Sequence, residues 1–197
     1  MTTKEAILEK ALELFSERGF DSVSVRDISS ELGLSEAAMY RHYRGKDALL
    51  DAIVRKAEED DRRKAIENGL PEDIDGSTVS AEAFLSFSSS IFRYWTEDSF
   101  AIRFRRLLTI EQYSNPRLGM LYENYLSSGP LGYTEYCLKK LGAEDAESAA
   151  LSFYASLRLL MDLSDHGMGK EEIGIRLDAI IREIKERIHG IHKKQEV

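Results

Sequence analysis

Apolar residues recur at helical spacing along nearly the whole chain, and no segment alternates apolar and polar residues long enough to predict a β-strand. The chain contains three prolines, Pro71, Pro116 and Pro130, and each falls between periodic segments. Because proline removes a helical hydrogen bond and clashes with the preceding turn, this placement leaves every expected helix uninterrupted. The sequence therefore predicts an all-α fold.

Capping patterns mark the first two expected helices. Thr2 and Glu5 form a capping-box pattern before the first helix, which we expect to end at Gly19. Ser24 and Asp27 repeat the pattern before a short second helix. Each helix thus has a start signal that satisfies its exposed backbone N–H groups.

A third short helix is expected over residues 36–43, with Ser35 as its N-cap and the tight turn 33–35 before it. Two short helices joined by a three-residue turn that contains glycine form a helix-turn-helix unit. In such a unit the N-terminal residues of the second helix face base edges in the major groove of DNA. We therefore expect Ala38 and Met39 to pack inward, with their neighbours in the helix exposed.

Residues 37–46 contain no acid, although the chain carries a formal net charge of −8. This window holds Arg41, Arg44 and Lys46 between aromatic residues. An acidic protein repels DNA at long range, but exposed charges are screened within about 8 Å at physiological salt, so a contact surface responds to its local charge. The window favours a DNA contact surface; the alternative interpretation is an ordinary solvated face.

Beyond this window the sequence predicts a longer helix over 46–68 and an expected linker over 68–78. Five further helical stretches are expected at 80–98, 99–113, 117–141 with a break near 127–130, 144–166 and 170–189. The last two carry apolar stripes beside polar faces, which is typical of a pairing surface for a homodimer. The alternative is that these stripes only pack within their own chain.

The segment SVRDISSELGLSEAAMYRHYRGKDALL resembles the DNA-binding segment of the TetR family of bacterial transcriptional regulators. The resemblance rests on the glycine turn 33–35, on Tyr40 and His42 followed by an aromatic residue, and on the Lys46-Asp47 start of the next helix. It covers residues 6–53, and the rest matches only in being helical and of suitable length. It implies a three-helix helix-turn-helix DNA-binding domain at 1–50, followed by a larger helical dimerisation and ligand-binding domain at 51–197.

The resemblance also implies roles for individual residues. The expected DNA contacts are phosphates at Ser24 and Arg26, a backbone clamp at Tyr40 and Lys46, and bases or sugars at Ser35, Glu36, Ala37, Arg41 and His42. The expected ligand-binding residues are Trp95, Phe104, Tyr113, Tyr125 and Tyr154. Tyr43 stands where the family more often has phenylalanine, and we expect a core ring whose hydroxyl reaches solvent.

The function implied is that of a sequence-specific DNA-binding transcriptional regulator. It would act as a homodimer through its last two helices on a double-stranded, palindromic operator, as a repressor that an unknown small-molecule effector releases. The alternative is a helical ligand-binding or protein-interaction module that has lost DNA binding. No residue identifies the effector, the operator or the direction of regulation.

Other functional classes lack their signatures. The sequence has no glycine-rich phosphate loop, nucleophile elbow or metal-ligand spacing, so we expect neither an enzyme, a cofactor nor a metal site. The single cysteine, Cys137, cannot form an internal disulfide and fits a reducing cytosol. No apolar run reaches about 18 residues, and no signal-peptide core is visible, so a cytoplasmic location without membrane association is expected.

Overall fold

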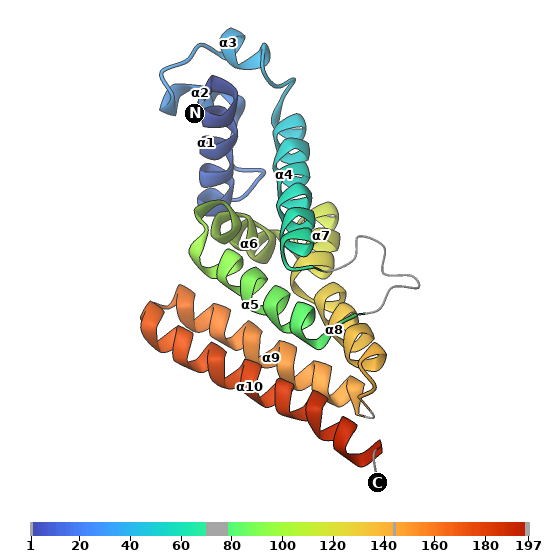
Figure 1. Ribbon diagram of the computed structural model, residues 1–197. Helices are drawn as coiled ribbons and strands as arrows, with labels where there is room; N and C mark the ends of the chain where they lie inside the picture. Colours follow the sequence, from blue (N-terminus) through green and yellow to red (C-terminus); the bar gives the residue numbers. More distant parts are fainter. Residues whose placement is uncertain (1, 70–78, 144, 196–197) are drawn as a thin grey trace. The chain divides into compact units, whose positions relative to one another are not determined.

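The computed structural model describes residues 2–69, 79–143 and 145–195, with side chains described as far as residue 188. These residues form helices and no strand, which confirms the all-α prediction (Figure 1). The helices are α1 (Thr3–Arg18), α2 (Val25–Glu31), α3 (Glu36–Tyr40), α4 (Lys46–Glu67), α5 (Ala81–Glu97), α6 (Ser99–Glu111), α7 (Pro116–Leu126), α8 (Ser128–Lys140), α9 (Ala146–Asp165) and α10 (Lys170–Gln195). Most of the expected linker, from residue 70 to 78, lies outside the described residues.

The predicted helix starts are confirmed in the N-terminal segment. Thr2 and Glu5 form a reciprocal capping box before α1, and Gly19 ends that helix with a φ of 81°. Ser24 and Asp27 form a second capping box before α2. Hydrogen bonding to Ser24, through its hydroxyl and its backbone N–H, lowers the pKa of Asp27.

The turn between α2 and α3 is closed by backbone bonds. The N–H of Leu34 donates to the carbonyl of Ser29 at 2.9 Å, and the N–H of Gly33 donates to that of Ser30 at 3.1 Å. These two bonds form a Schellman arrangement, which needs a left-handed residue, and Gly33 supplies it with a φ of 63°. The glycine turn read from the sequence is therefore the end of α2.

The third helix is shorter than predicted. It ends at Tyr40 rather than at residue 43. The N–H groups of both His42 and Tyr43 donate to the carbonyl of Met39, so the chain leaves the helix in a tight turn. Tyr43 is thereby turned into the core, where it is 7% exposed.

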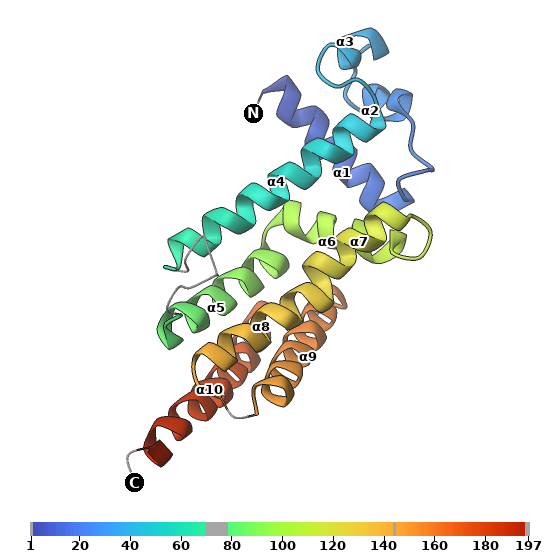
Figure 2. The same cartoon turned by 90° about the vertical axis from the view of Figure 1, so that its right-hand side faces the viewer.

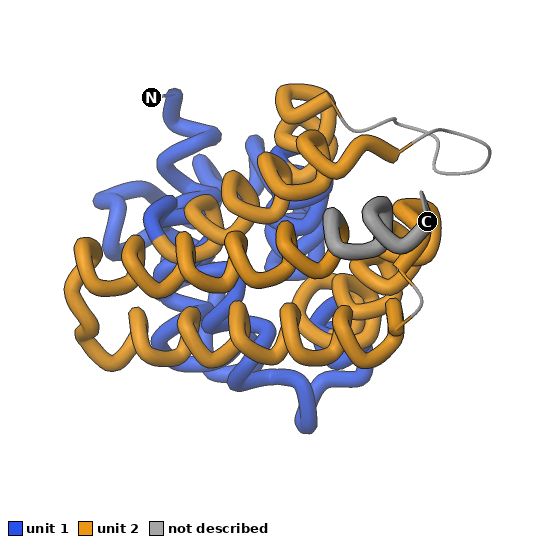
Figure 3. Tube along the Cα trace, turned by 60° about the horizontal axis from the view of Figure 1, so that its bottom comes forward, with its two compact units in different colours: residues 1–60, 97–122 blue, residues 61–96, 123–197 orange. Residues whose placement is uncertain are grey.

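The chain divides into two compact units, drawn in Figure 3. Unit 1 comprises Met1–Asp60 and Glu97–Tyr122; unit 2 comprises Asp61–Thr96 and Glu123–Val197. The expected DNA-binding segment 1–50 lies wholly in unit 1, where α6 accompanies it. The functional division at residue 50 stays a prediction.

The core of unit 1 joins the short helices to longer ones. Side chains from α1, α2, α3, α4 and α6 meet there without exposure, namely Phe15, Ile28, Met39, Leu49 and Phe104. Helix α1 packs against α6 and α2, and α2 against α3. Because an isolated helix of five to seven residues is unstable in water, α2 and α3 depend on this shared core.

Unit 2 contains α8, α9 and α10, most of α5, and the ends of α4 and α7. Helix α8 packs against α9, and α9 lies side by side with α10 (Figures 1 and 2). The apolar stripe predicted for the last helix buries Ile173, Leu177, Ile184 and Ile188. The predicted stripe therefore packs within its own chain.

Unit 2 also holds a desolvated carboxylate. Burial raises the pKa of Asp61, on α4, from 3.8 to about 6. Asp61 makes no ion pair or hydrogen bond with any residue that the structure describes. Its charge helps to raise the pKa of Tyr133 on α8, whose main cause is burial. A carboxylate without a partner destabilises the fold when it is ionised.

We expect Asp61→Asn to stabilise the protein at neutral pH. The raised pKa means that the folded state binds a proton more tightly than the unfolded state, so stability is lost as pH rises from about 4 to about 6. At pH 7.5 the variant should gain up to about 3 kcal/mol in the free energy of unfolding, and the gain should fall by about half at pH 5. Urea unfolding at both pH values measures this.

The exposed residue Asp178, on α10, supplies the control for this experiment. The Asp178→Asn variant should unfold like the wild type at both pH values. A variant Asp61→Asn that is less stable than the wild type at pH 7.5 would show that the Asp61 charge is compensated.

Candidate nucleic-acid interface

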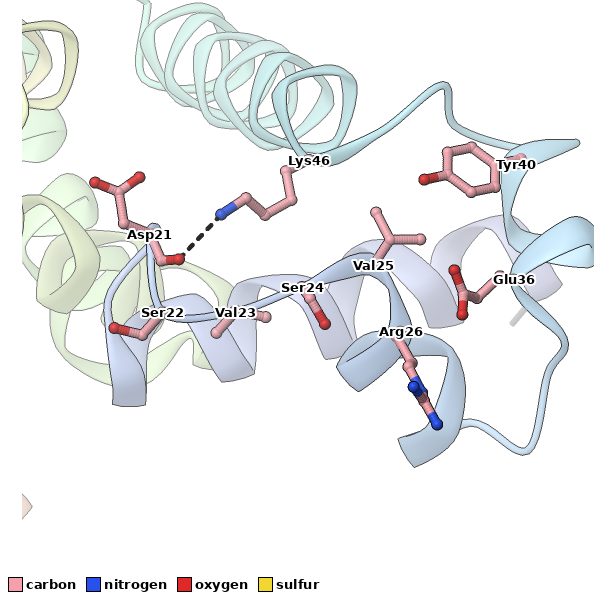
Figure 4. A pocket seen from close by; sticks show the side chains of 9 residues that line it. All are labelled: Asp21, Ser22, Val23, Ser24, Val25, Arg26, Glu36, Tyr40 and Lys46. Carbon is pink, nitrogen blue, oxygen red and sulfur yellow. Dashed lines mark hydrogen bonds between the residues drawn. The ribbon is translucent and has the colours of Figure 1, made fainter.

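A recess of about 400 Å³ opens on unit 1 where the α1–α2 loop, the start of α2, helix α3 and the start of α4 meet (Figure 4). It brings together five of the nine residues that the resemblance assigns to DNA. Its lining consists of Asp21, Ser22, Val23, Ser24, Val25, Arg26, Glu36, Tyr40 and Lys46. Segments separated by more than 20 residues thus form one surface.

Lys46, the first residue of α4, is anchored to the loop between α1 and α2. Its ammonium donates to the carbonyls of Phe20 at 2.8 Å and Asp21 at 3.3 Å, and it lies 4.6 Å from the centre of the Phe20 ring. Figure 4 shows the side chain turned toward Asp21. An ammonium has three donors, so one N–H is left for a phosphate oxygen.

Ser24 serves its helix cap. Its hydroxyl donates to the Asp27 carboxylate at 2.6 Å and accepts from the Asp27 N–H at 3.1 Å, while its own N–H donates to the same carboxylate at 2.7 Å. Both donors of Ser24 are therefore engaged, and a phosphate contact would compete with the cap. Ser35 differs, because its hydroxyl accepts from the N–H of Ala38 at 3.1 Å and its proton stays available.

Helix α3 shows the predicted sidedness. Met39 is fully buried and Ala38 half-buried, whereas Glu36, Ala37 and Tyr40 are exposed on the other side. Figure 4 shows Glu36 and Tyr40 extending from α3 at the edge of the recess. The face expected to meet base edges is therefore open.

Tyr43 departs from its expected orientation. The ring is in the core as predicted, but the hydroxyl donates to the carbonyl of Lys4 at 3.3 Å instead of reaching solvent. Burial raises the pKa of Tyr43. The hydroxyl joins the start of α1 to the end of the α3 segment, a structural contact that a phenylalanine could not make.

The positive side chains of this surface are unpaired within the described part of the chain. Arg26, Arg41 and Arg44 are exposed and make no ion pair there, and His42 is exposed as well. Two acids, Asp21 and Glu36, also line the recess. The three arginines and Lys46 therefore provide the positive charge of the surface, and the recess itself carries both signs.

The five expected ligand residues are divided between the two units. The ring centres of Trp95 and Tyr125 lie 6.1 Å apart in unit 2, and Tyr154 is half-buried in the same unit. Phe104 is fully buried in unit 1, stacked on Phe100. Tyr113, also in unit 1, is 93% exposed in the turn after α6.

Sequence reasoning missed the groups that hold Lys46. The carbonyls of Phe20 and Asp21 are backbone acceptors, which leave no trace in the side-chain pattern. It also missed Glu111, whose carboxylate accepts from the N–H of Phe20 across 91 positions of sequence. The sequence showed only that a glycine, Gly19, precedes this turn.

Other kinds of site leave no mark on the described residues. Within residues 2–69, 79–143 and 145–195 no three His, Cys, Asp or Glu side chains gather as a metal site would require. Cys137 is fully buried, and burial raises its pKa, which disfavours the reactive thiolate. In the same ranges no helix combines the length and the apolar character that crossing a bilayer demands.

The N-terminal part of the chain matches known regulators. Residues 7–53 match the family model described as bacterial regulatory proteins of the tetR family. The class D tetracycline repressor protein of Escherichia coli is 38% identical over 50 residues, 25% of this chain and 23% of that protein. The transcriptional repressor Rv1474c of Mycobacterium tuberculosis is 36% identical over 67 residues, 34% of this chain and 36% of that protein. The matched segments thus span about a quarter to a third of these relatives.

The fold extends the likeness over the whole chain. A TetR-like transcriptional regulator from Rhodococcus sp. RHA1 superposes with a TM-score of 0.69 over 94% of this chain and 95% of that one, at 17% identity. At this identity the superposition shows the fold alone. The sequence match identifies the family, and it covers the helix-turn-helix with the exposed side of α3. The chain belongs to the TetR family of bacterial transcriptional regulators.

Proposed function

We propose that this protein is a sequence-specific DNA-binding regulator that represses transcription until a small-molecule effector releases it. One observation carries the proposal: the fold gathers Ser24, Arg26, Glu36, Tyr40 and Lys46 at one recess beside the exposed face of α3 and the acid-free residues 37–46. Phosphate contacts around the recess would set the register of the helix on the duplex, and side chains of α3 would read base edges. Repression is supported by the two relatives described as repressors.

The functional division proposed follows from this role. Residues 1–50 would form the DNA-binding domain, and residues 51–197 the domain for dimerisation and effector binding. The exposed residues Ser35 just before α3, Ala37 on it, and Arg41 and His42 just after it can reach bases or sugars. Glu36 would be repelled by phosphates, but its carboxylate can accept from a cytosine amino group.

A homodimer is supported by apolar side chains that the single chain leaves uncovered. Leu151 and Leu159 on α9 are 58% and 59% exposed, and Ile175 on α10 is 65% exposed. Leu151, the exposed Ala155 and Leu159 follow one another at four-residue intervals, so they share one helix face. Pairing of these faces would bury them and present two reading heads to half-sites about 34 Å apart on a palindromic operator.

The effector is the least constrained partner. The paired rings of Trp95 and Tyr125, with Tyr154 in the same unit, support an aromatic binding region in unit 2. Phe104 and Tyr113 lie in unit 1, so only the resemblance proposes them as ligand-binding residues. The name of the tetracycline repressor links one relative to a small molecule. An effector would act by binding more tightly to the dimer geometry that does not fit DNA.

Titration against fluorescent duplexes tests the proposal. The duplexes are taken from the DNA flanking the protein's own gene, with a scrambled control, at two salt concentrations. Tight, salt-dependent binding of two protomers to one duplex, and not to the control, is the expected result. Weak binding that ignores sequence would instead support a helical interaction module that has lost DNA binding.

We expect Lys46→Ala to weaken binding to operator and control DNA alike. Removing one phosphate contact per protomer should make the slope of log K against log salt less steep by about 2 in the dimer. Ala37→Ser, a change on the exposed face of α3, should instead alter which duplex is preferred. Fluorescence anisotropy at four salt concentrations measures both variants. The opposite pattern would mean that the two roles are exchanged.

We expect Leu159→Glu to dissociate the dimer, because it places two charges in a surface that pairing must dehydrate. Light scattering after size exclusion should show a dimer for the wild type and a monomer for the variant at micromolar concentration. The control is Ile66→Glu, at an apolar α4 residue that is 50% exposed, which should remain a dimer. A wild-type monomer would refute the dimer.

A further inference from the structure

The carboxylate of Glu111, the last residue of α6, is buried against the turn between α1 and α2. Glu111 is only 7% exposed. Its Oε1 accepts from the N–H of Phe20 at 2.7 Å, and its Oε2 accepts from the hydroxyl of Ser114 at 2.7 Å. Both oxygens are thus bonded, and a hydrogen bond to a charged acceptor at this distance is a strong one.

Gly19 leaves the space that this carboxylate occupies. A Cβ at Gly19 would lie 2.8 Å from Oε1 of Glu111, closer than real Cβ atoms approach other atoms. The φ of Gly19, 81°, is also one that other residues rarely adopt. The turn is therefore shaped both to end α1 and to receive a side chain from α6.

The backbone of Phe20 is bonded on its other side by a DNA-contact candidate. Its carbonyl accepts from the ammonium of Lys46 at 2.8 Å, and its ring lies 4.6 Å below the same ammonium. A carboxylate thus holds the N–H of Phe20 while an ammonium holds its C=O. A lysine side chain has four rotatable bonds, so the place of its ammonium is set by the groups that bind it.

We propose that Glu111 is a positioning residue for Lys46: by holding the backbone of Phe20, it sets where the Lys46 ammonium stands in the DNA-contact recess. This inference rests on the proposed DNA-binding function. Glu111 itself does not line the recess and touches no residue assigned to DNA. Glu111 would affect DNA binding through the two hydrogen bonds of the Phe20 backbone, one to Glu111 and one to Lys46.

A second link between α6 and α1 provides a matched control. Arg103 of α6 lies 3.7 Å from the Glu9 carboxylate and 3.5 Å from the Glu13 carboxylate, both on α1. These ion pairs join the same two helices without contact to Phe20 or Lys46. A general loosening of α6 from α1 would follow from Arg103→Gln as well as from Glu111→Gln, whereas the positioning effect belongs to Glu111 alone.

The test compares operator binding of Glu111→Gln, Arg103→Gln and the wild type across salt concentrations. Glutamine keeps the shape of the side chain and a neutral acceptor but removes the charge. Glu111→Gln should weaken operator binding about tenfold and make the salt slope less steep, in the direction of Lys46→Ala. Arg103→Gln should leave the slope unchanged.

A double-mutant cycle separates positioning from a structural role. In a Lys46→Ala background, Glu111→Gln should lower the affinity for the operator less than twofold, because the ammonium that Glu111 positions is gone. If Glu111→Gln lowers operator affinity by the same tenfold in that background, or if Arg103→Gln lowers it as much as Glu111→Gln does, the inference is overturned while the DNA-binding function stands.

If the Glu111→Gln variant fails to fold, Ser114→Ala replaces it, because this change removes the hydrogen bond to Oε2 and keeps the one to Oε1. It should lower operator affinity by a smaller factor, with the same dependence on Lys46. Wild-type protein that ignores DNA sequence overturns the proposed function and this inference together.

Discussion

Helix α3, whose exposed side we propose reads base edges, has only five residues and cannot be stable alone. It persists because Met39 is fully buried, because Ser35 caps its first turn, and because the Schellman bonds at Gly33 fix the chain that enters it. Each of these anchors lies on the inner side or at the end of the helix. The residues on the outer side are therefore not needed to stabilise the helix, so they can vary to suit an operator without loss of the fold.

The backbone of Phe20 plays a comparable part for the surface that we propose contacts phosphates. Lys46 is bound to the loop between α1 and α2, and Glu111 binds the same loop from α6. A loop is usually the most mobile part of such a domain, but charged side chains bond this one at three successive peptide groups. The residues proposed to contact DNA at the start of α2 and the start of α4 are consequently held at a common surface.

Much of the local structure was predictable from the sequence. The caps at Thr2, Ser24 and Ser35 and the glycine stops at Gly19 and Gly33 are confirmed, because each depends on backbone chemistry within a few residues. Pro116 and Pro130 lie in the first turns of α7 and α8, so neither interrupts a helix interior. The inward side of α3 was predictable for the same reason, since helical geometry fixes which residues share a face. The early end of α3 was not, because it follows from the burial of Tyr43 and its bond to Lys4, 39 positions away.

By itself the sequence determined the all-α fold, the places where the helices of the reading head begin, and the identity of the basic, acid-free segment, all of which follow from short-range patterns. Only the tertiary structure decided that backbone carbonyls bind Lys46 and that the Ser24 hydroxyl donates to the carboxylate of its own helix cap. It also decided that the Glu111 carboxylate bonds the N–H of Phe20 and that Asp61 is desolvated. The physical reason is distance along the chain. Burial, and hydrogen bonds between segments up to 91 positions apart, arise only when the helices pack.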